Sequence, residues 1–178
     1  MVISRPEKLS HTQTMLYEID MLRETAQKLS KNNWNAEKDK WTCLESFLLH
    51  FRNLIEFFGR PDPRGDDLHI TKPDAFWPEV SQRPAEAVRE GLVRRDLWDE
   101  YEDAKPDRIS KYLHHCTETR IETKEWKVGE MFGELQPTLI SFESLVLDRR
   151  RPWETVQGAE IPRSVTGATG PGAPPAVK

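Results

Sequence analysis

The sequence contains little of what several classes of protein require. It has two cysteines among 178 residues, Cys43 and Cys116, which are too few for a disulfide scaffold or a four-thiolate zinc site. No apolar run approaches the roughly 18 residues that a membrane-spanning helix needs, and no apolar signal segment follows Met1. These absences favour a cytoplasmic protein with no membrane-spanning segment.

Basic residues are not in excess. The chain holds 26 Lys and Arg residues against 30 Asp and Glu residues, which gives a net charge of −4 and an isoelectric point near 5.8. Binding of nucleic acid along the whole surface is therefore disfavoured, because contact with phosphates needs a basic footprint. A local basic patch is still compatible with this charge. The run Arg149-Arg150-Arg151 fits a solvated helix end better than such a patch.

Apolar residues recur at steps of three and four along most of the chain, which is typical of amphipathic helices. The pattern predicts five helices, over residues 6–31, 35–59, 84–102, 106–120 and from about 123 to 146. Asn35 is the expected N-cap of the second helix, and Pro137 predicts a kink in the last one. No alternating strand pattern of useful length is present. The sequence therefore predicts an all-α bundle of four or five helices.

The second predicted helix has the strongest periodicity. Its apolar stripe is formed by Trp41, Leu44, Leu48, Phe51, Ile55 and Phe58. A stripe of this kind predicts the face that the helix turns toward the core.

Two segments lack the helical pattern. Prolines and a glycine between residues 60 and 84 exclude a continuous helix there. Apolar side chains in the same segment, among them Leu68 and Ile70 with Phe76 and Trp77, predict a long loop that packs partly over the core. Beyond Arg149 the chain is rich in Pro and Gly and poor in large apolar residues. We expect a helical domain over residues 1–149 and a disordered tail over residues 150–178.

A helical-wheel projection predicts a polar cluster at the edge of the core. Arg120 projects almost along the buried direction of its predicted helix, so it needs a partner, for which Glu45 is the first choice. The predicted cluster comprises Glu45, Arg52, His115 and Arg120, with the loop acids Asp66 and Asp67 covering it. Such a cluster is either a salt-bridge network that fixes helix register or a functional site.

Metal-binding patterns are weak. The sequence has no Glu-x-x-His pair of the kind that a di-metal helical bundle uses. His114 with Glu118, and Asp66 and Asp67 with His69, have spacings that arise easily by chance. We therefore expect no metal site and no cofactor. Both cysteines fall on or near apolar helix faces, which predicts small buried side chains.

Two stretches of sequence and three further residues carry a resemblance to a known family. The stretches are ESFLLHFRNLIEFF (residues 45–58) and ISKYLHHCTETR (residues 109–120), and the residues are Asp66, Asp67 and Trp126. Together they resemble a group of bacterial proteins that look like HEPN-like (AbiU-type) helical domains. The resemblance covers roughly residues 36–148. Many HEPN domains are metal-independent ribonucleases of toxin–antitoxin and phage-defence systems.

The catalytic motif of this family is an arginine followed, after four to six residues, by a histidine, usually with a polar residue directly after the arginine. Arg108 and His115 fit this motif with six intervening residues, and they share one face of the predicted helix. Ile109 occupies the position of the polar residue, whereas Arg52 has the polar follower Asn53 but no histidine within reach. The resemblance implies His115 as general acid/base, with Arg108 or Arg52 stabilising charge on the phosphate.

Two functions follow from these observations. The leading hypothesis is a non-catalytic HEPN-like domain that binds a partner, RNA or protein, or forms a homodimer through the second helix and the Arg108/His115 flank. The alternative is a metal-independent endoribonuclease of a toxin–antitoxin or phage-defence system. In that case two chains must bring their flanks together, because one short helix face offers too few cationic groups to hold a phosphate.

Overall fold

The computed structural model describes residues 5–32, 34–72, 90–103, 108–114 and 125–146. Their regular structure is entirely helical, with no strand in these ranges, which confirms the all-α prediction. The elements are α1 (Arg5–Lys31), α2 (Glu37–Gly59), α4 (Arg95–Trp98), the π-helical turn η1 (Asp99–Asp103), α5 (Ile109–His114) and α6 (Val128–Leu145). None of these helices combines the length and the apolar character that crossing a membrane requires.

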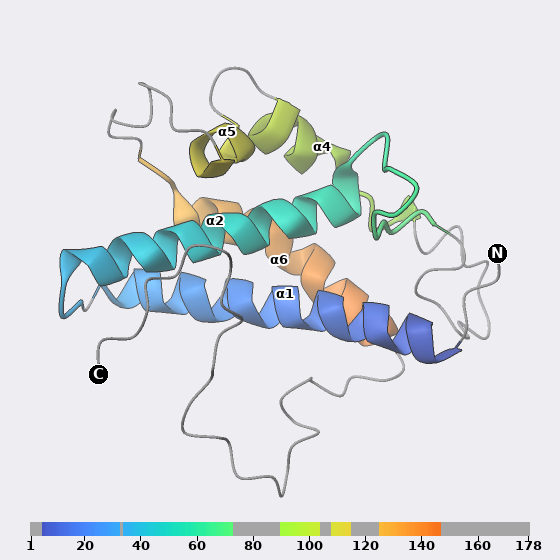
Figure 1. Cartoon of the computed structure of the whole chain (residues 1–178), viewed down its shortest axis with the longest axis horizontal. Coiled ribbons are helices and arrows are strands. Elements are labelled where there is room, and N and C mark those ends of the chain that lie inside the picture. Colours follow the sequence, from blue (N-terminus) through green and yellow to red (C-terminus); the bar gives the residue numbers. More distant parts are fainter. Residues whose placement is uncertain (1–4, 33, 73–89, 104–107, 115–124, 147–178) are drawn as a thin grey trace, which may run out of the picture.

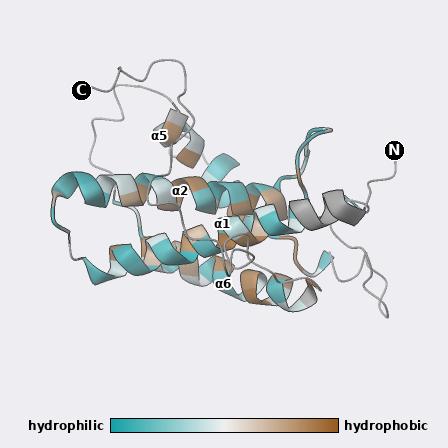
Figure 2. Cartoon of the chain, turned by 60° about the horizontal axis from the view of Figure 1, so that its bottom comes forward, coloured by the Kyte–Doolittle hydropathy of each residue, from teal (hydrophilic) through white to brown (hydrophobic). Residues whose placement is uncertain are grey.

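The two long helices form an antiparallel hairpin (Figure 1). In that view α6 crosses the hairpin from behind, and α4 and α5 lie along the other side of α2. Apolar surface is concentrated where α1, α2 and α6 face one another, and the outer faces are mostly hydrophilic (Figure 2). Helix α2 is therefore the central element of the bundle, because α1, α4 and α5 all pack against it.

Most of the predicted apolar stripe of α2 lies in the core. Leu48, Phe51, Ile55 and Phe58 are fully buried. Phe58 also meets Phe142 of α6 edge to face, with ring centroids 5.6 Å apart. Burial of each such side chain stabilises a protein by roughly 1.5–3 kcal/mol, so this stripe accounts for much of the packing energy of the hairpin.

Trp41, predicted to belong to the same stripe, is 43% exposed, so its placement in the core is wrong. The second helix also begins later than predicted, since Ala36 occupies the N-cap position in place of Asn35 and makes no side-chain capping bond.

The helix predicted over residues 84–102 is not continuous. Residues 91–94 are not helical, and helical structure resumes only at Arg95. The backbone N–H of Arg94 donates to the carbonyl of Phe58 at 2.9 Å, so the chain binds the end of α2 at this point. Gly91 favours such a break, because glycine is the weakest helix former after proline. A tertiary contact thus overrides the helical periodicity.

The last helix begins at Val128 and not near Thr123, because residues 125–127 are not helical. It continues through Pro137 to Leu145. Helix α5 begins at Ile109 and is described as far as His114, so the predicted extension to residue 120 lies outside the described residues.

The described part of the loop after α2 packs on the core as predicted. Ile70 is fully buried, and its N–H donates to the carbonyl of Phe57 at 3.0 Å. Leu68 packs against the same core. Phe76 and Trp77, the domain boundary at residue 149 and the predicted tail lie outside the described residues.

Gly59 provides a test of the junction between α2 and residue 94. A Cβ at Gly59 would lie 2.3 Å from the carbonyl oxygen of Arg94, which is backbone and cannot rotate away. Gly59→Ala should therefore lower the free energy of unfolding by about 3 kcal/mol. Gly133→Ala, within α6 and with open space around its Cβ, should raise it by about 0.5–1 kcal/mol. Urea denaturation followed by circular dichroism measures both, and equal effects of the two variants would contradict the predicted contact.

Candidate functional site

A ladder of alternating charges runs along the last two turns of α2 and into the loop. Arg52 and Arg60 both pair with Glu56, which lies one turn from each, and Arg52 Nη1 is 2.9 Å from Glu56 Oε2. Arg60 continues the ladder to Asp67, with 3.1 Å between Nη1 and Oδ2. Asp67 in turn accepts the backbone N–H of Arg64 at 2.8 Å. Ion pairs therefore tie the described loop to the end of α2.

Arg52 also joins α2 to the two short elements beside it. Its Nε donates to the Ser110 hydroxyl at 2.7 Å and lies 3.8 Å from Glu102 Oε1. Glu102, whose side chain is 5% exposed, accepts hydrogen bonds from both the backbone N–H and the hydroxyl of Ser110. The carboxylate of η1 thus binds the first turn of α5, and the guanidinium of α2 compensates its charge.

A second polar group connects α2 to α1. Glu18 Oε2 lies 2.7 Å from His50 Nδ1 and accepts a hydrogen bond from Asn53 Nδ2 at 3.1 Å. His50 is buried, and the ring of Tyr17 packs edge-on against it at 5.8 Å. Asn53 Oδ1 accepts a longer bond of 3.4 Å from Arg52, so the two groups are continuous.

We call this connected set the α2 network. It comprises Glu18, His50, Arg52, Asn53, Glu56, Arg60, Asp67, Glu102 and Ser110. Its four carboxylates outnumber its two guanidinium groups, so the network favours cations over anions. Glu18, Asn53, Glu56 and Asp67 also line a small cavity of about 190 Å³ between α1, α2 and the loop.

The network contains two of the residues predicted for the polar cluster, Arg52 and Asp67, and joins them through Glu56 and Arg60. Asp67 supplies the loop carboxylate, whereas Asp66 is exposed. Glu45 occupies an exposed position of α2, and its predicted partner Arg120 lies outside the described residues, so its place in the cluster stays a prediction.

The Arg108/His115 flank is described only in part. Arg108 is exposed at the start of α5. His115 and Arg120 lie outside the described residues, so the pairing predicted for Arg120 and the alignment of His115 with Arg108 stay predictions.

Several network residues were missed by the sequence analysis. The spacing of Arg52, Glu56 and Arg60 is a visible signal, because opposite charges four residues apart on a helix form a ladder. Glu18, His50 and Glu102 carry no comparable signal. Each is placed by a neighbouring element that is distant in the sequence.

His69 lies beneath the ladder and is 3% exposed. Its Nδ1 accepts the backbone N–H of Thr71 at 3.2 Å and lies 2.7 Å from the Thr71 hydroxyl. Its Nε2 is buried without a hydrogen-bond partner in the described part of the chain. Burial lowers the pKa of His69 below its usual value. Within the same ranges, no group of three or more His, Cys, Asp or Glu side chains is arranged to hold a metal ion.

Comparisons of the chain with protein-family models, with curated proteins and with solved structures find no significant match. The resemblance to HEPN-like domains therefore stays a prediction from the residues that carry it.

The link between Arg52 and Glu102 is testable by a double-mutant cycle. Arg52→Met should lower the free energy of unfolding by about 3 kcal/mol, because it leaves the Glu102 carboxylate buried without its cation. Adding Glu102→Gln should restore about 1 kcal/mol or more. The exposed Arg108→Met is the control and should change stability by less than about 0.5 kcal/mol. Additive effects of the two network substitutions in urea denaturation would contradict the link.

The lowered pKa of His69 predicts that the stability of the protein depends on pH. Because its pKa is lowered in the folded state, the unfolded state binds the proton more readily. Neutral His69 makes its full contribution to the free energy of unfolding at pH values above its usual pKa near 6.5. This contribution falls as the pH decreases toward the pKa of His69 in the folded state. His69→Asn keeps an acceptor near the position of Nδ1 but does not titrate. The loss of stability between pH 7.5 and 5.5 should be smaller in this variant than in the wild type, and an equal loss would assign the effect to other groups.

Proposed function

We propose that this protein is a non-catalytic HEPN-like helical domain whose partner is a second copy of itself. The observation that supports this proposal is that the guanidinium of Arg52 is already paired and largely buried. Its guanidinium is shared between Glu56, Glu102 and Ser110, and its side chain is only 20% exposed. An arginine in this position stabilises the arrangement of helices and is not available to an incoming phosphate.

The charge of the α2 network also opposes catalysis of RNA cleavage. Cleavage of RNA without a metal needs cationic groups directed at the charge that develops on the phosphate. The α2 network carries an excess of carboxylates, and a phosphate would have to displace Glu56 and Glu102 from Arg52 while approaching Glu18 and Asp67. Repulsion and the loss of two ion pairs both oppose this.

The exposed side of α2 supplies the surface for self-association. Leu49 is 40% exposed, and it lies three residues before Arg52 on the adjoining part of the helix surface. The hydrogen bond from Arg52 to Ser110 brings α5 against this edge, and Arg108 stands exposed at the start of α5. An apolar centre with a charged rim is the usual composition of a protein–protein interface.

A metal-independent endoribonuclease is the second candidate. One observation favours it. His50 and Asn53 both contact the Glu18 carboxylate, and Asn53 accepts a hydrogen bond from Arg52. An Arg-Asn pair and a histidine therefore belong to one network, although no histidine follows Arg52 at the spacing of the family motif.

Sedimentation velocity and an RNA assay distinguish the two functions. The wild type should form a dimer, and Leu49→Lys should shift it to the monomer. Ile140→Lys is the matched control, because Ile140 is 55% exposed on α6, and it should leave the dimer intact. Incubation of bulk RNA with the wild type in EDTA should leave the RNA uncleaved.

Other outcomes would contradict the proposal. A wild type that stays monomeric at all concentrations excludes self-association. Cleavage in EDTA that is abolished by Arg108→Ala or His115→Ala establishes the ribonuclease instead. Cleavage only with an added divalent metal excludes both candidates and makes Asp66, Asp67 and His69 the residues to substitute.

A further inference from the structure

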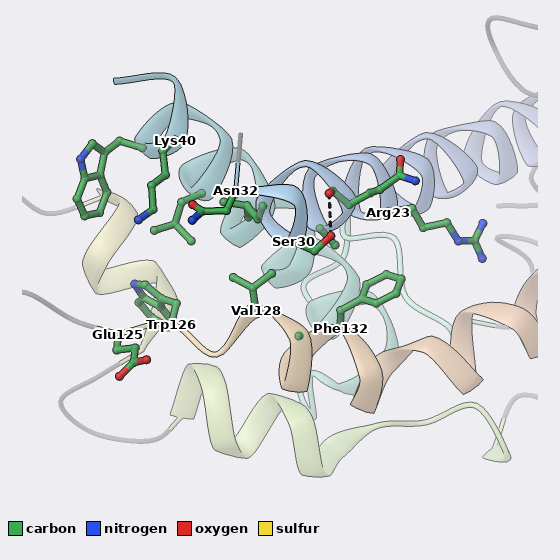
Figure 3. Close-up of a pocket in the computed structure, with 14 residues that line it drawn as sticks. Arg23, Ser30, Asn32, Lys40, Glu125, Trp126, Val128 and Phe132 are labelled. Carbon is green, nitrogen blue, oxygen red and sulfur yellow. Dashed lines mark hydrogen bonds between the residues drawn. The ribbon is translucent and has the colours of Figure 1, made fainter. Parts of the chain in front are cut away.

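A separate cavity opens at the other end of the hairpin. It has a volume of about 680 Å³ and lies between the end of α1, the start of α2 and the start of α6 (Figure 3). Ligand-binding cavities in proteins commonly measure about 300–1,000 Å³. The cavity contains no residue of the α2 network.

Most of the cavity wall is apolar. Leu29 and Leu44 line it from the hairpin, and Val128 and Phe132 line it from α6. Two tryptophans complete this wall: Trp41 of α2, and Trp126, which lies just before α6. Trp41 is 43% exposed, so a large aromatic surface is left uncovered at the opening. Such a wall favours a ligand with an apolar body.

The charged groups at the cavity differ in their availability. Arg23 is held by Glu143 of α6, with a hydrogen bond of 2.8 Å from Nη1 to Oε1, and points away from the cavity in Figure 3. The carboxylate of Glu125 is also directed away from it. The side chain of Lys40 extends from α2 toward Trp126. None of the ion pairs between described residues involves its ammonium. The charge that the cavity offers to a ligand is therefore positive.

We propose that this cavity binds a small amphiphilic anion, namely a carboxylate with a single apolar chain or ring system. The apolar body lies against Trp41, Trp126 and Phe132, and the carboxylate pairs with Lys40 at the opening. This site is independent of self-association through Leu49 and of the network around Arg52.

The test uses decanoate below its micellar concentration as the probe, with decyltrimethylammonium as the control of opposite charge. Isothermal titration calorimetry of the full chain should show saturable binding of decanoate. Binding of decyltrimethylammonium should be at least tenfold weaker, because its headgroup meets Lys40 and not a carboxylate.

Two pairs of variants locate the site. Lys40→Met should weaken decanoate binding about three- to fivefold, as expected for an ion pair near the surface, whereas Lys38→Met, which alters an exposed lysine of α2 outside the cavity wall, should not. Gly129→Leu places a side chain into the cavity from α6 and should weaken binding at least tenfold. Gly133→Leu is the control, since Gly133 has equally open surroundings but does not line the cavity.

The proposal fails if decanoate does not bind or binds without saturation. It also fails if the cationic amphiphile binds equally well, or if Gly129→Leu and Gly133→Leu have the same effect. Circular dichroism of each variant confirms that the comparison is made between folded proteins.

Discussion

The guanidinium of Arg52 is the group on which the arrangement of the smaller helices depends. The described parts of η1 and α5 comprise five and six residues, which are too few to be stable alone. Apolar contacts hold them against α2, but apolar contacts alone do not fix their register. Glu102 and Ser110 do so, because a buried carboxylate requires both hydrogen-bond donors and a compensating cation. Arg52 supplies the cation, and its position on α2 therefore determines where both elements lie.

The same pairing has a functional consequence. A catalytic arginine must exchange its partners for a substrate, whereas Arg52 is bonded on three sides to groups that are themselves buried or part-buried. The energy that orders η1 and α5 would be lost in the exchange. A helical domain with this interior is suited to presenting a stable outer surface, which the proposed association with a second copy requires.

The long helices could be predicted from the sequence, and the site only in part. The apolar periodicity predicts α1 and α2 to within two residues at each end, because the stripe is a local property of the chain. The break at residues 91–94 could not be predicted, since it depends on a hydrogen bond to Phe58 and a close approach to Gly59. Arg52 and Asp67 were identified from the sequence. Glu18 and Glu102 were not, because they belong to other elements, and the apolar periodicity does not predict where those elements lie relative to α2.

The two ends of α2 also differ in what covers them, and the apolar periodicity does not predict this difference. The C-terminal end is closed by the backbone of Arg94 and by Ile70. At the other end, residues 125–127 are not helical, so α6 is shorter than its pattern predicts by at least these three residues, or about 4.5 Å of helix. Trp41 is predicted to be buried, but it is exposed and lines the cavity together with Trp126 of this non-helical segment. The cavity thus lies where local pattern and tertiary structure disagree, and such disagreements are often found at functional sites.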